Sequence, residues 1–208
     1  MNPVINAVVR PLHESALAEA TAADQALARG GPVGALHGVP ITIKVNVDMA
    51  GSPTDNGVVA FKNAMATRDN PVVANLRRAG GIVIGRTNTP TFSMRWFTDN
   101  ALHGATRNPW DARRTPGGSS GGAAAATASG IGAIAHGNDI AGSVRYPAYC
   151  CGLVGLRVSY GRVARLQLHR GHRAPPHLRP AHGGPGPAHP SRARRARGPR
   201  RDGGARSP

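Results

Sequence analysis

The composition of the chain changes abruptly at residue 164, and this change limits what each part can fold into. Residues 164–208 consist almost wholly of Arg, Pro, Gly, His and Ala, with three leucines and no aromatic or β-branched residue. Such a segment cannot bury enough apolar surface to offset the conformational entropy that folding removes. We therefore expect a folded domain over residues 1–163, followed by a disordered basic tail over residues 164–208.

The positive charge is concentrated in that tail. The net charge of the whole chain is +16, but 11 of its 26 Lys and Arg residues lie after Ala164, where the only acid is Asp202. A charge of this size usually indicates a nucleic-acid or anionic-membrane partner. Because the first 163 residues are only mildly basic, the charge predicts at most an unspecific attraction of the tail to nucleic acid.

Strand and helix patterns alternate along residues 1–163, which favours an α/β layered fold. Short apolar, β-branched runs predict strands at residues 4–9, 38–48 and 80–88, and Lys44 is the only basic residue of the second run. Helical spacing predicts helices at residues 14–29 and 71–78, each closed by a pair of glycines. A third helix, made of small residues, is expected between the GGSSGG loop at 117–122 and Gly130.

Three motifs stand out, and each has an ordinary explanation when it is taken alone. The GGSSGG run is typical of a flexible linker. It also matches the Gly-x-Ser-x-Gly pattern of a nucleophile elbow, but the preceding segment TRNPWDARRTP is a poor strand, and no phosphate-loop Gly-Lys-Ser/Thr follows. The segment NDIAGSVRYP at 138–147 fits a loop with a surface ion pair, and Lys44 fits a surface lysine with a buried stem.

Taken together, these segments resemble the amidase signature family. The resemblance runs from about Asn6 to Val163 and is strongest in LHGVPITIK, TPGGSSGG and NDIAGSVRYPAYCCGLVGLR, whose order and spacing agree with the family. It implies an α/β/α layered fold with a mixed central sheet. It also implies a catalytic triad in which Ser143 is the nucleophile, Ser119 the relay and Lys44 the base. A buried lysine has a lowered pKa and can be neutral near pH 7, as a base must be.

The same resemblance assigns supporting roles around the triad. The peptide bond between Gly118 and Ser119 is expected to be cis, and Ser120 is expected to be a supporting residue at the N-cap of the next helix. Asp139 and Arg145 are expected to anchor the nucleophile loop without taking part in the reaction. Four backbone N–H groups would form the oxyanion hole, those of Ile140, Ala141, Gly142 and Ser143.

The implied reaction is hydrolysis of a small carboxylic or aryl amide to an acid and ammonia through an acyl-enzyme, with no metal or organic cofactor. One alternative is the A subunit of a tRNA-dependent amidotransferase, which releases ammonia from glutamine. The segment MRWFTDN at 94–100 resembles the free amidases more than that subunit. The other alternative is a nonfunctional fragment, or a nonspecific nucleic-acid binder that acts through the basic tail.

The resemblance covers only the N-terminal portion of the family's domain, which continues beyond the position of Val163 through further strands and helices. Residues 164–208 look instead like GC-rich coding sequence translated out of frame. A truncated domain leaves sheet edges unpaired, and unpaired edges promote aggregation. We therefore expect the chain alone to be poorly stable and to be impaired or inactive as an enzyme.

The sequence favours a cytoplasmic location. The two cysteines, Cys150 and Cys151, are neighbours and so do not indicate a disulfide framework. Nothing at the N-terminus resembles a secretory signal, and the most apolar stretch is short and interrupted by Gly130 and Gly132. We expect a small-molecule amide as the partner, with no membrane span and no specific nucleic-acid target.

Overall fold

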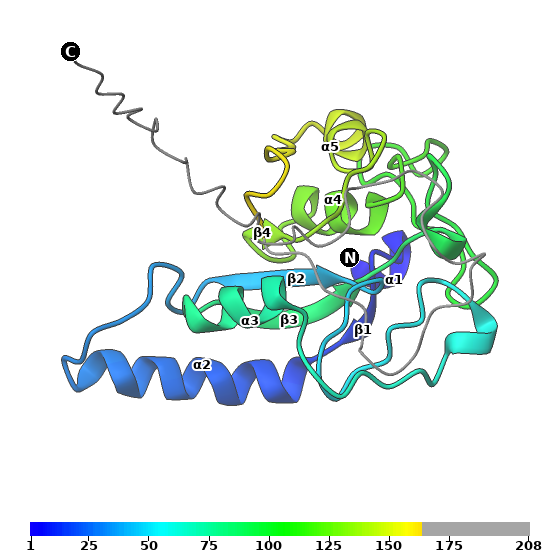
Figure 1. Cartoon of the computed structure of the whole chain (residues 1–208). Coiled ribbons are helices and arrows are strands. Elements are labelled where there is room, and N and C mark those ends of the chain that lie inside the picture. The colour runs from blue at the N-terminus through cyan, green and yellow to red at the C-terminus, as the bar shows by residue number, and fades with distance from the viewer. Residues whose placement is uncertain (164–208) are drawn as a thin grey trace, which may run out of the picture. The chain divides into compact units, whose positions relative to one another are not determined.

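A four-stranded sheet runs through residues 1–163, the part of the chain that the computed structural model describes (Figure 1). The strands are β1 (Val8–Pro11), β2 (Pro40–Lys44), β3 (Ile82–Thr87) and β4 (Ile134–Ala135), and their order across the sheet is β1-β3-β2-β4. β3 is antiparallel to β1 and parallel to β2, which is also parallel to β4. The mixed sheet confirms that part of the expected fold. The expected disordered tail and its suggested out-of-frame origin concern residues 164–208, which lie outside the described residues.

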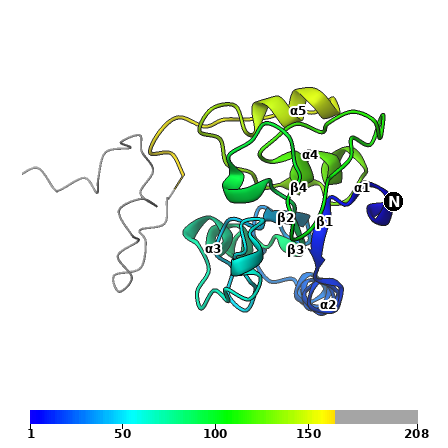
Figure 2. The same ribbon diagram turned by 90° about the vertical axis from the view of Figure 1, so that its right-hand side faces the viewer.

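Helices cover both faces of the sheet, so the layering is α/β/α as the resemblance implies (Figures 1 and 2). On one face lie α2 (His13–Ala28) and α3 (Pro71–Arg78). On the other face lies α4 (Gly121–Ala128), with α5 (Arg145–Cys151) packed on its outer side. Shorter pieces are α1 (Asn2–Ile5) and the 3-10 turns Val59–Phe61 and Thr91–Ser93. Within residues 1–163 no helix has the length and apolar character that crossing a bilayer requires.

Two apolar clusters hold the layers together. The larger joins α3 to the inner strands, and its buried members are Ile41, Ile43, Val47, Met49, Val73 and Val83. The smaller joins the N-terminal segment to α4 through Ile5, Ala7, Val8, Ala125 and Ala126. Helix α4 can approach the sheet closely because its residues are small. A Cβ added at Gly122 would lie only 2.4 Å from the main-chain nitrogen of Asn88, which no side chain could tolerate.

Strand β2 presents different side chains to the two faces, because successive side chains of a strand alternate. Ile41 and Ile43 belong to the larger apolar cluster, and Thr42 and Lys44 occupy the alternate positions. Lys44 ends the strand, is fully buried, and reaches the serines that precede α4. The fold therefore places a single basic side chain beneath the start of a helix made of small residues.

The predicted helix at residues 71–78 is confirmed as α3, and local signals explain why its ends were predictable. Pro71 opens the helix, the side chain of Asn70 accepts a hydrogen bond of 3.1 Å from the N–H of Val72, and Gly80 follows the end with φ at 91°. The predicted helix at 14–29 is also confirmed, one residue earlier, as α2.

The expected strand at residues 4–9 is wrong in its first half. Residues 2–5 form α1, and only Val8 and Val9 of the expected span belong to a strand. The side chain of Asn2 explains the difference, because its Oδ1 accepts hydrogen bonds from the N–H groups of Ala7 at 3.1 Å and Val8 at 2.8 Å. Side chains of asparagine compete in this way with regular backbone pairing, and the chain turns before it enters the sheet.

Candidate active site

The amine of Lys44 has three hydrogen-bond partners in a fully buried position. The distances from Nζ are 2.7 Å to Ser119 Oγ, 2.9 Å to Asn138 Oδ1 and 3.1 Å to Ser120 Oγ. These partners come from the loop before α4 and from the loop after β4, so three separate segments meet at one nitrogen atom. The structure thus brings together Lys44 and Ser119, the two residues that the sequence pairs as base and relay.

Burial decides the charge of this lysine. Removal from water lowers the pKa of Lys44 to about 7, although the negative charge of Asp139 acts in the opposite direction. At neutral pH a large fraction of the side chain is therefore an uncharged amine. An uncharged amine carries a lone pair and can accept a proton from a neighbouring hydroxyl group.

The loop that carries Ser119 is shaped by glycine. The peptide bond between Gly118 and Ser119 is cis, as the resemblance implies. A Cβ added at Gly118 would lie 2.6 Å from the main-chain oxygen of Arg95, so the loop can pass this segment only with glycine at the position. The main-chain oxygen of Ser119 accepts a hydrogen bond of 3.1 Å from the hydroxyl of Thr89, which ties the loop to the end of β3.

Ser120 occupies the N-cap position of α4, but its side chain does not cap the helix. Its hydroxyl oxygen accepts from Lys44 Nζ, and its hydroxyl group donates to the main-chain oxygen of Asn138 at 3.4 Å. The expected capping role is therefore wrong. The hydroxyl group of Ser120 is instead engaged by the amine of Lys44 and the main-chain oxygen of Asn138, and both of these groups lie in the site.

The loop expected to hold the nucleophile is organised by Asp139. The carboxylate of Asp139 accepts hydrogen bonds from the N–H groups of Gly142 at 2.7 Å, Val144 at 3.1 Å and Arg145 at 3.3 Å. The guanidinium of Arg145 adds bonds of 3.0 and 3.1 Å. Burial alone would raise the pKa of Asp139, but these hydrogen bonds outweigh it and hold that pKa well below its usual range. The carboxylate therefore stays charged, and its hydrogen bonds hold the backbone of the loop in place.

Two features of this loop differ from the expected constellation. The N–H of Gly142, expected in the oxyanion hole, donates to Asp139 instead, so in this structure that group is occupied. Among the described residues no acceptor is found for the N–H groups of Ile140, Ala141 or Ser143. No hydrogen bond within residues 1–163 joins the hydroxyl of Ser143 to that of Ser119; the loop is attached instead through a bond of 3.1 Å from Ser120 N–H to the main-chain oxygen of Ser143.

Asn138 and Asn46 are polar residues of the site that the sequence analysis does not name. Asn138 touches Lys44 directly, and its amide also pairs with the amide of Asn46. Both are neighbours of residues that the sequence analysis names: Asn138 directly precedes Asp139, and Asn46 lies two residues after Lys44, in the turn that follows β2.

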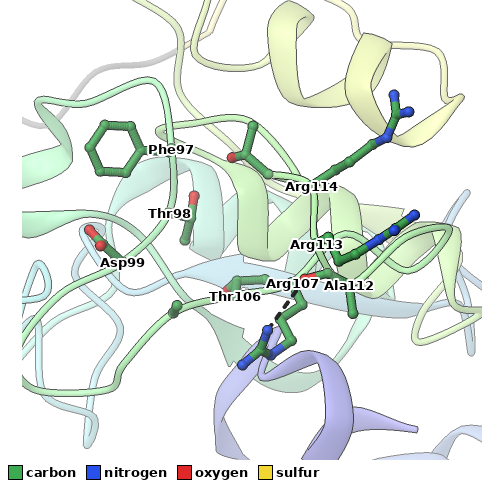
Figure 3. A pocket seen from close by; sticks show the side chains of 10 residues that line it. Phe97, Thr98, Asp99, Thr106, Arg107, Ala112, Arg113 and Arg114 are labelled. Carbon is green, nitrogen blue, oxygen red and sulfur yellow. Dashed lines mark hydrogen bonds between the residues drawn. The ribbon is translucent and has the colours of Figure 1, made fainter.

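A separate pocket lies between the segments at residues 97–99, 105–107 and 112–115 (Figure 3). It is lined by Phe97, Thr98 and Asp99, together with residues 105–107 and 112–115. Among its lining residues, Arg107 donates to the main-chain oxygen of Ala112 at 3.3 Å. Neither Lys44 nor the two triad serines line this pocket, so it is separate from the candidate active site.

Comparison with known proteins agrees with this geometry. The family model described as Amidase matches residues 1–181. Indoleacetamide hydrolase of Bradyrhizobium diazoefficiens is 60% identical over 163 residues, which are 78% of this chain and 31% of that protein. The A subunit of glutamyl-tRNA(Gln) amidotransferase from a Cyanothece species is 42% identical over 168 residues, 81% of this chain and 35% of that protein. The chain therefore spans about a third of the length of the curated relatives it matches.

Solved structures show the same relation. A bacterial aryl acylamidase of the amidase signature family superimposes with a TM-score of 0.68 at 37% identity, covering 71% of this chain and 31% of that one. The 6-aminohexanoate cyclic dimer hydrolase superimposes with a TM-score of 0.66 at 40% identity, covering 73% and 30%. With a family model over most of its length, relatives at this identity and a shared fold, the chain belongs to the amidase family.

Proposed function

We propose that this chain carries the catalytic residues of an amide hydrolase, with Ser143 as nucleophile, Ser119 as relay and Lys44 as base. The observation that carries the proposal is the buried amine of Lys44, 2.7 Å from Ser119 Oγ and with a pKa of about 7. An amine with this pKa is a competent base at neutral pH. A surface lysine would remain protonated under the same conditions.

The proposed reaction passes through an acyl-enzyme. Ser143 Oγ bonds to the carbonyl carbon of the amide, its proton passes to Ser119, and the proton of Ser119 passes to Lys44. The carbon–nitrogen bond then breaks, and the proton returns through Ser119 to the departing ammonia. Water attacks the ester in the same manner, releases the carboxylic acid and restores Ser143. In unliganded enzymes catalytic hydrogen bonds are often long, so we expect the Ser143–Ser119 contact to form when substrate binds.

The negative oxygen of the tetrahedral intermediate needs hydrogen-bond donors. We propose that the N–H groups of Ile140, Ala141 and Ser143 supply them, because no protein acceptor occupies these groups within residues 1–163. Gly142 then has a structural part, since its N–H holds the Asp139 carboxylate. The ion pair of Asp139 and Arg145, at 3.0 Å, supports an anchoring role for both residues.

The proposed substrate is a small carboxylic or aryl amide, and indole-3-acetamide is the first compound to test. This choice rests on the relative named indoleacetamide hydrolase, whose 60% identity exceeds the 42% of the amidotransferase protein. Glutamine is the second candidate substrate. Ammonia release from glutamine, absent with indole-3-acetamide, would reverse this order.

A covalent probe tests the site directly in this chain, which spans about a third of the length of its relatives. A small fluorophosphonate should phosphonylate Ser143: the Ser143 Oγ–phosphorus bond forms, fluoride leaves, and the proton passes through Ser119 to Lys44. Mass spectrometry of peptides from the full 208-residue chain should find one adduct on Ser143.

The controls for this probe are a nucleophile variant and an unrelated lysine variant. Ser143→Ala should remove the adduct, whereas Lys62→Arg, at an exposed position, should keep it. An adduct rate that rises with pH through about 7 and then levels off is expected, because Lys44 must be neutral to act. If the same adduct forms in Ser143→Ala, the proposal is refuted.

We further propose a cytoplasmic setting. Cys150 and Cys151 are free thiols in the structure, and unpaired cysteines fit a reducing compartment. Fractionation of cells that express the chain, with detection of the full-length product, would test this assignment.

A further inference from the structure

Asn46 and Asn138 form a reciprocal amide pair beside Lys44. Asn138 Nδ2 donates to Asn46 Oδ1 at 3.0 Å, and Asn46 Nδ2 donates to Asn138 Oδ1 at 3.2 Å. Turning either amide over would set nitrogen against nitrogen and oxygen against oxygen. The pairing therefore couples the orientations of the two amides, and in this arrangement the atom of Asn138 that faces the lysine is the oxygen, 2.9 Å from Nζ.

The pair is anchored to the rest of the fold. Asn46 Nδ2 also donates to Ser93 Oγ at 2.9 Å, and the Ser93 hydroxyl donates to Asn56 Oδ1 at 2.9 Å. The hydroxyl of Thr89 lies 2.8 Å from the same Ser93 oxygen. These bonds connect Asn46 to the loop before the 3-10 turn at Val59–Phe61 and to the segment after β3. Asn138 is thus held through Asn46 by residues far from it in sequence.

The hydrogen atoms of a neutral Lys44 can be assigned from these contacts. A neutral amine has two N–H bonds and one lone pair. Asn138 Oδ1 can only accept, so it takes one N–H. Ser120 Oγ takes the other, because the hydroxyl proton of Ser120 is directed at the main-chain oxygen of Asn138. The lone pair is then left for the third neighbour, the Ser119 hydroxyl at 2.7 Å.

The protonated lysine fits the same partners. An ammonium group has three N–H bonds, and the oxygens of Ser119, Ser120 and Asn138 can accept all three. Only the Ser119 contact changes direction between the two states. The site can therefore take up and release a proton along the Ser119–Lys44 line without rearranging its other bonds.

We propose that Asn138, held in its orientation by Asn46, is a positioning residue that directs the lone pair of Lys44 at Ser119. The inference deepens the proposed function, because its value for catalysis depends on Lys44 acting as the base. Asn138 does not touch the reacting atoms of the substrate in this scheme. It acts through the lysine.

Other charged groups near Lys44 are few and can be held constant. The negative charge of Asp139 raises the lysine's pKa. Arg86 donates to the main-chain oxygen of Lys44 at 3.3 Å, and burial lowers the pKa of His136 to about 4, so that this imidazole stays neutral near pH 7. A substitution at Asn138 leaves all three groups unchanged.

Lysine-selective NMR provides the test, because Lys44 and Lys62 are the only lysines of the chain. Labelling lysine with ¹³C at Cε gives two signals in the 208-residue protein, and Lys62→Arg assigns them. Asn138→Leu removes a hydrogen-bond acceptor of Lys44. Because a charged ammonium group gains more from that acceptor than a neutral amine does, the midpoint of the Lys44 titration should fall by about 0.5 to 1 unit. Asn108→Leu is the matched control: Asn108 bonds the main-chain oxygens of Thr115 and Cys150, away from the lysine, and should leave the midpoint unchanged.

The second readout is the rate of Ser143 phosphonylation at pH 9, where Lys44 is neutral in every variant. Asn138→Leu should react about tenfold more slowly, because the lone pair is no longer directed at Ser119. If Asn138→Leu does not fold, Asn46→Ala is judged by the same two readouts. The inference is overturned if folded Asn138→Leu, or Asn46→Ala in its place, titrates Lys44 with the same midpoint as the wild type. It is also overturned if that variant is phosphonylated at pH 9 as fast as the wild type. A wild-type chain that never reacts at Ser143 refutes the proposed function instead, while the NMR titration still decides whether Asn138 holds the amine.

Discussion

The two halves of the candidate site are held in different ways. Lys44 is fully buried, and its amine is bonded to side chains from two distant segments of the chain. The segment that carries Ser143 is shaped mainly by one of its own residues, Asp139, and Ile140 within it is 76% exposed. Long-range contacts and burial therefore fix the base, and short-range hydrogen bonds fix the nucleophile loop.

This difference predicts different effects of substitutions in the two halves. Changes at Lys44 remove the base and also alter a buried group, so they should be visible both in the reaction of Ser143 and in how the free energy of unfolding depends on pH. Changes at Asp139 alter a loop on one side of the domain and should be visible mainly in the reaction of Ser143. Four experiments test this difference.

The largest effect is expected for Lys44→Met, which removes the base and keeps the volume of the side chain. Loss of a general base typically costs about 10²- to 10⁴-fold in rate, so Ser143 phosphonylation should fall by that factor. Circular dichroism should show a retained fold, because the methionine side chain fills nearly the same buried volume. A phosphonylation rate within threefold of wild type would show that another group takes the proton.

Asp139→Asn should have the next largest effect, and it should act mainly on the loop, although loss of the carboxylate charge also lowers the pKa of Lys44 further. An amide in place of the carboxylate loses the ion pair with Arg145. Because the N–H groups of Gly142 and Val144 bond different oxygens of Asp139, the amide also sets its NH₂ group against one of these two N–H groups. Hydrogen bonds to charged groups contribute about 1.5 to 3 kcal/mol each, so phosphonylation should slow by roughly 10- to 100-fold. The melting temperature should change little; a large drop would mean that the loop is part of the folding unit.

The pH dependence of stability tests the buried side. Lys44 has a pKa of about 7 in the folded chain against the ordinary 10.5, so between these values the unfolded chain binds more protons. The free energy of unfolding should therefore rise with pH over this range, by up to about 1.4 kcal/mol per unit, and be insensitive to Lys44 below pH 7. Urea titrations at several pH values should find this slope in the wild type and not in Lys44→Met. Equal slopes would place the lysine in water.

Arg113→Ala is the control for both halves, and it should have the smallest effect on stability and on the phosphonylation rate. The side chain of Arg113 is 89% exposed and pairs with Asp111 at 3.0 Å. Exposed ion pairs contribute little, so stability should stay within about 0.5 kcal/mol and the phosphonylation rate should not change. An effect larger than that of Asp139→Asn would contradict the division into two halves.

The sequence predicted what neighbouring residues determine. Asn70, Pro71 and Gly80 mark the ends of α3 within a few positions of one another, and the helix was predicted at its observed bounds. The N-terminal helix was missed because the side chain of Asn2 competes with strand pairing. A local pattern gives no sign of such a bond.

The candidate site divides in the same way. The assignment of Lys44, Ser119 and Ser143 rests on three motifs whose order and spacing together resemble the amidase signature family, because each motif alone has an ordinary explanation. The contact between Asn46 and Asn138 joins residues 92 positions apart, and only the folded chain reveals it. The occupied N–H of Gly142 was missed for a related reason, since the sequence does not tell which donors of a loop a neighbouring carboxylate will take.

The alternation along β2 has a consequence for how this chain can vary. Ile41 and Ile43 supply apolar packing on one face, and Lys44 supplies a reactive group on the other. The register of the strand decides which face each of these side chains occupies. Deleting a single residue between Gly38 and Lys44 would turn the lysine toward the apolar cluster and an isoleucine toward Ser119. Variants of this chain should therefore tolerate volume-conserving substitutions in the strand. Insertions and deletions should be tolerated only in loops such as residues 30–37.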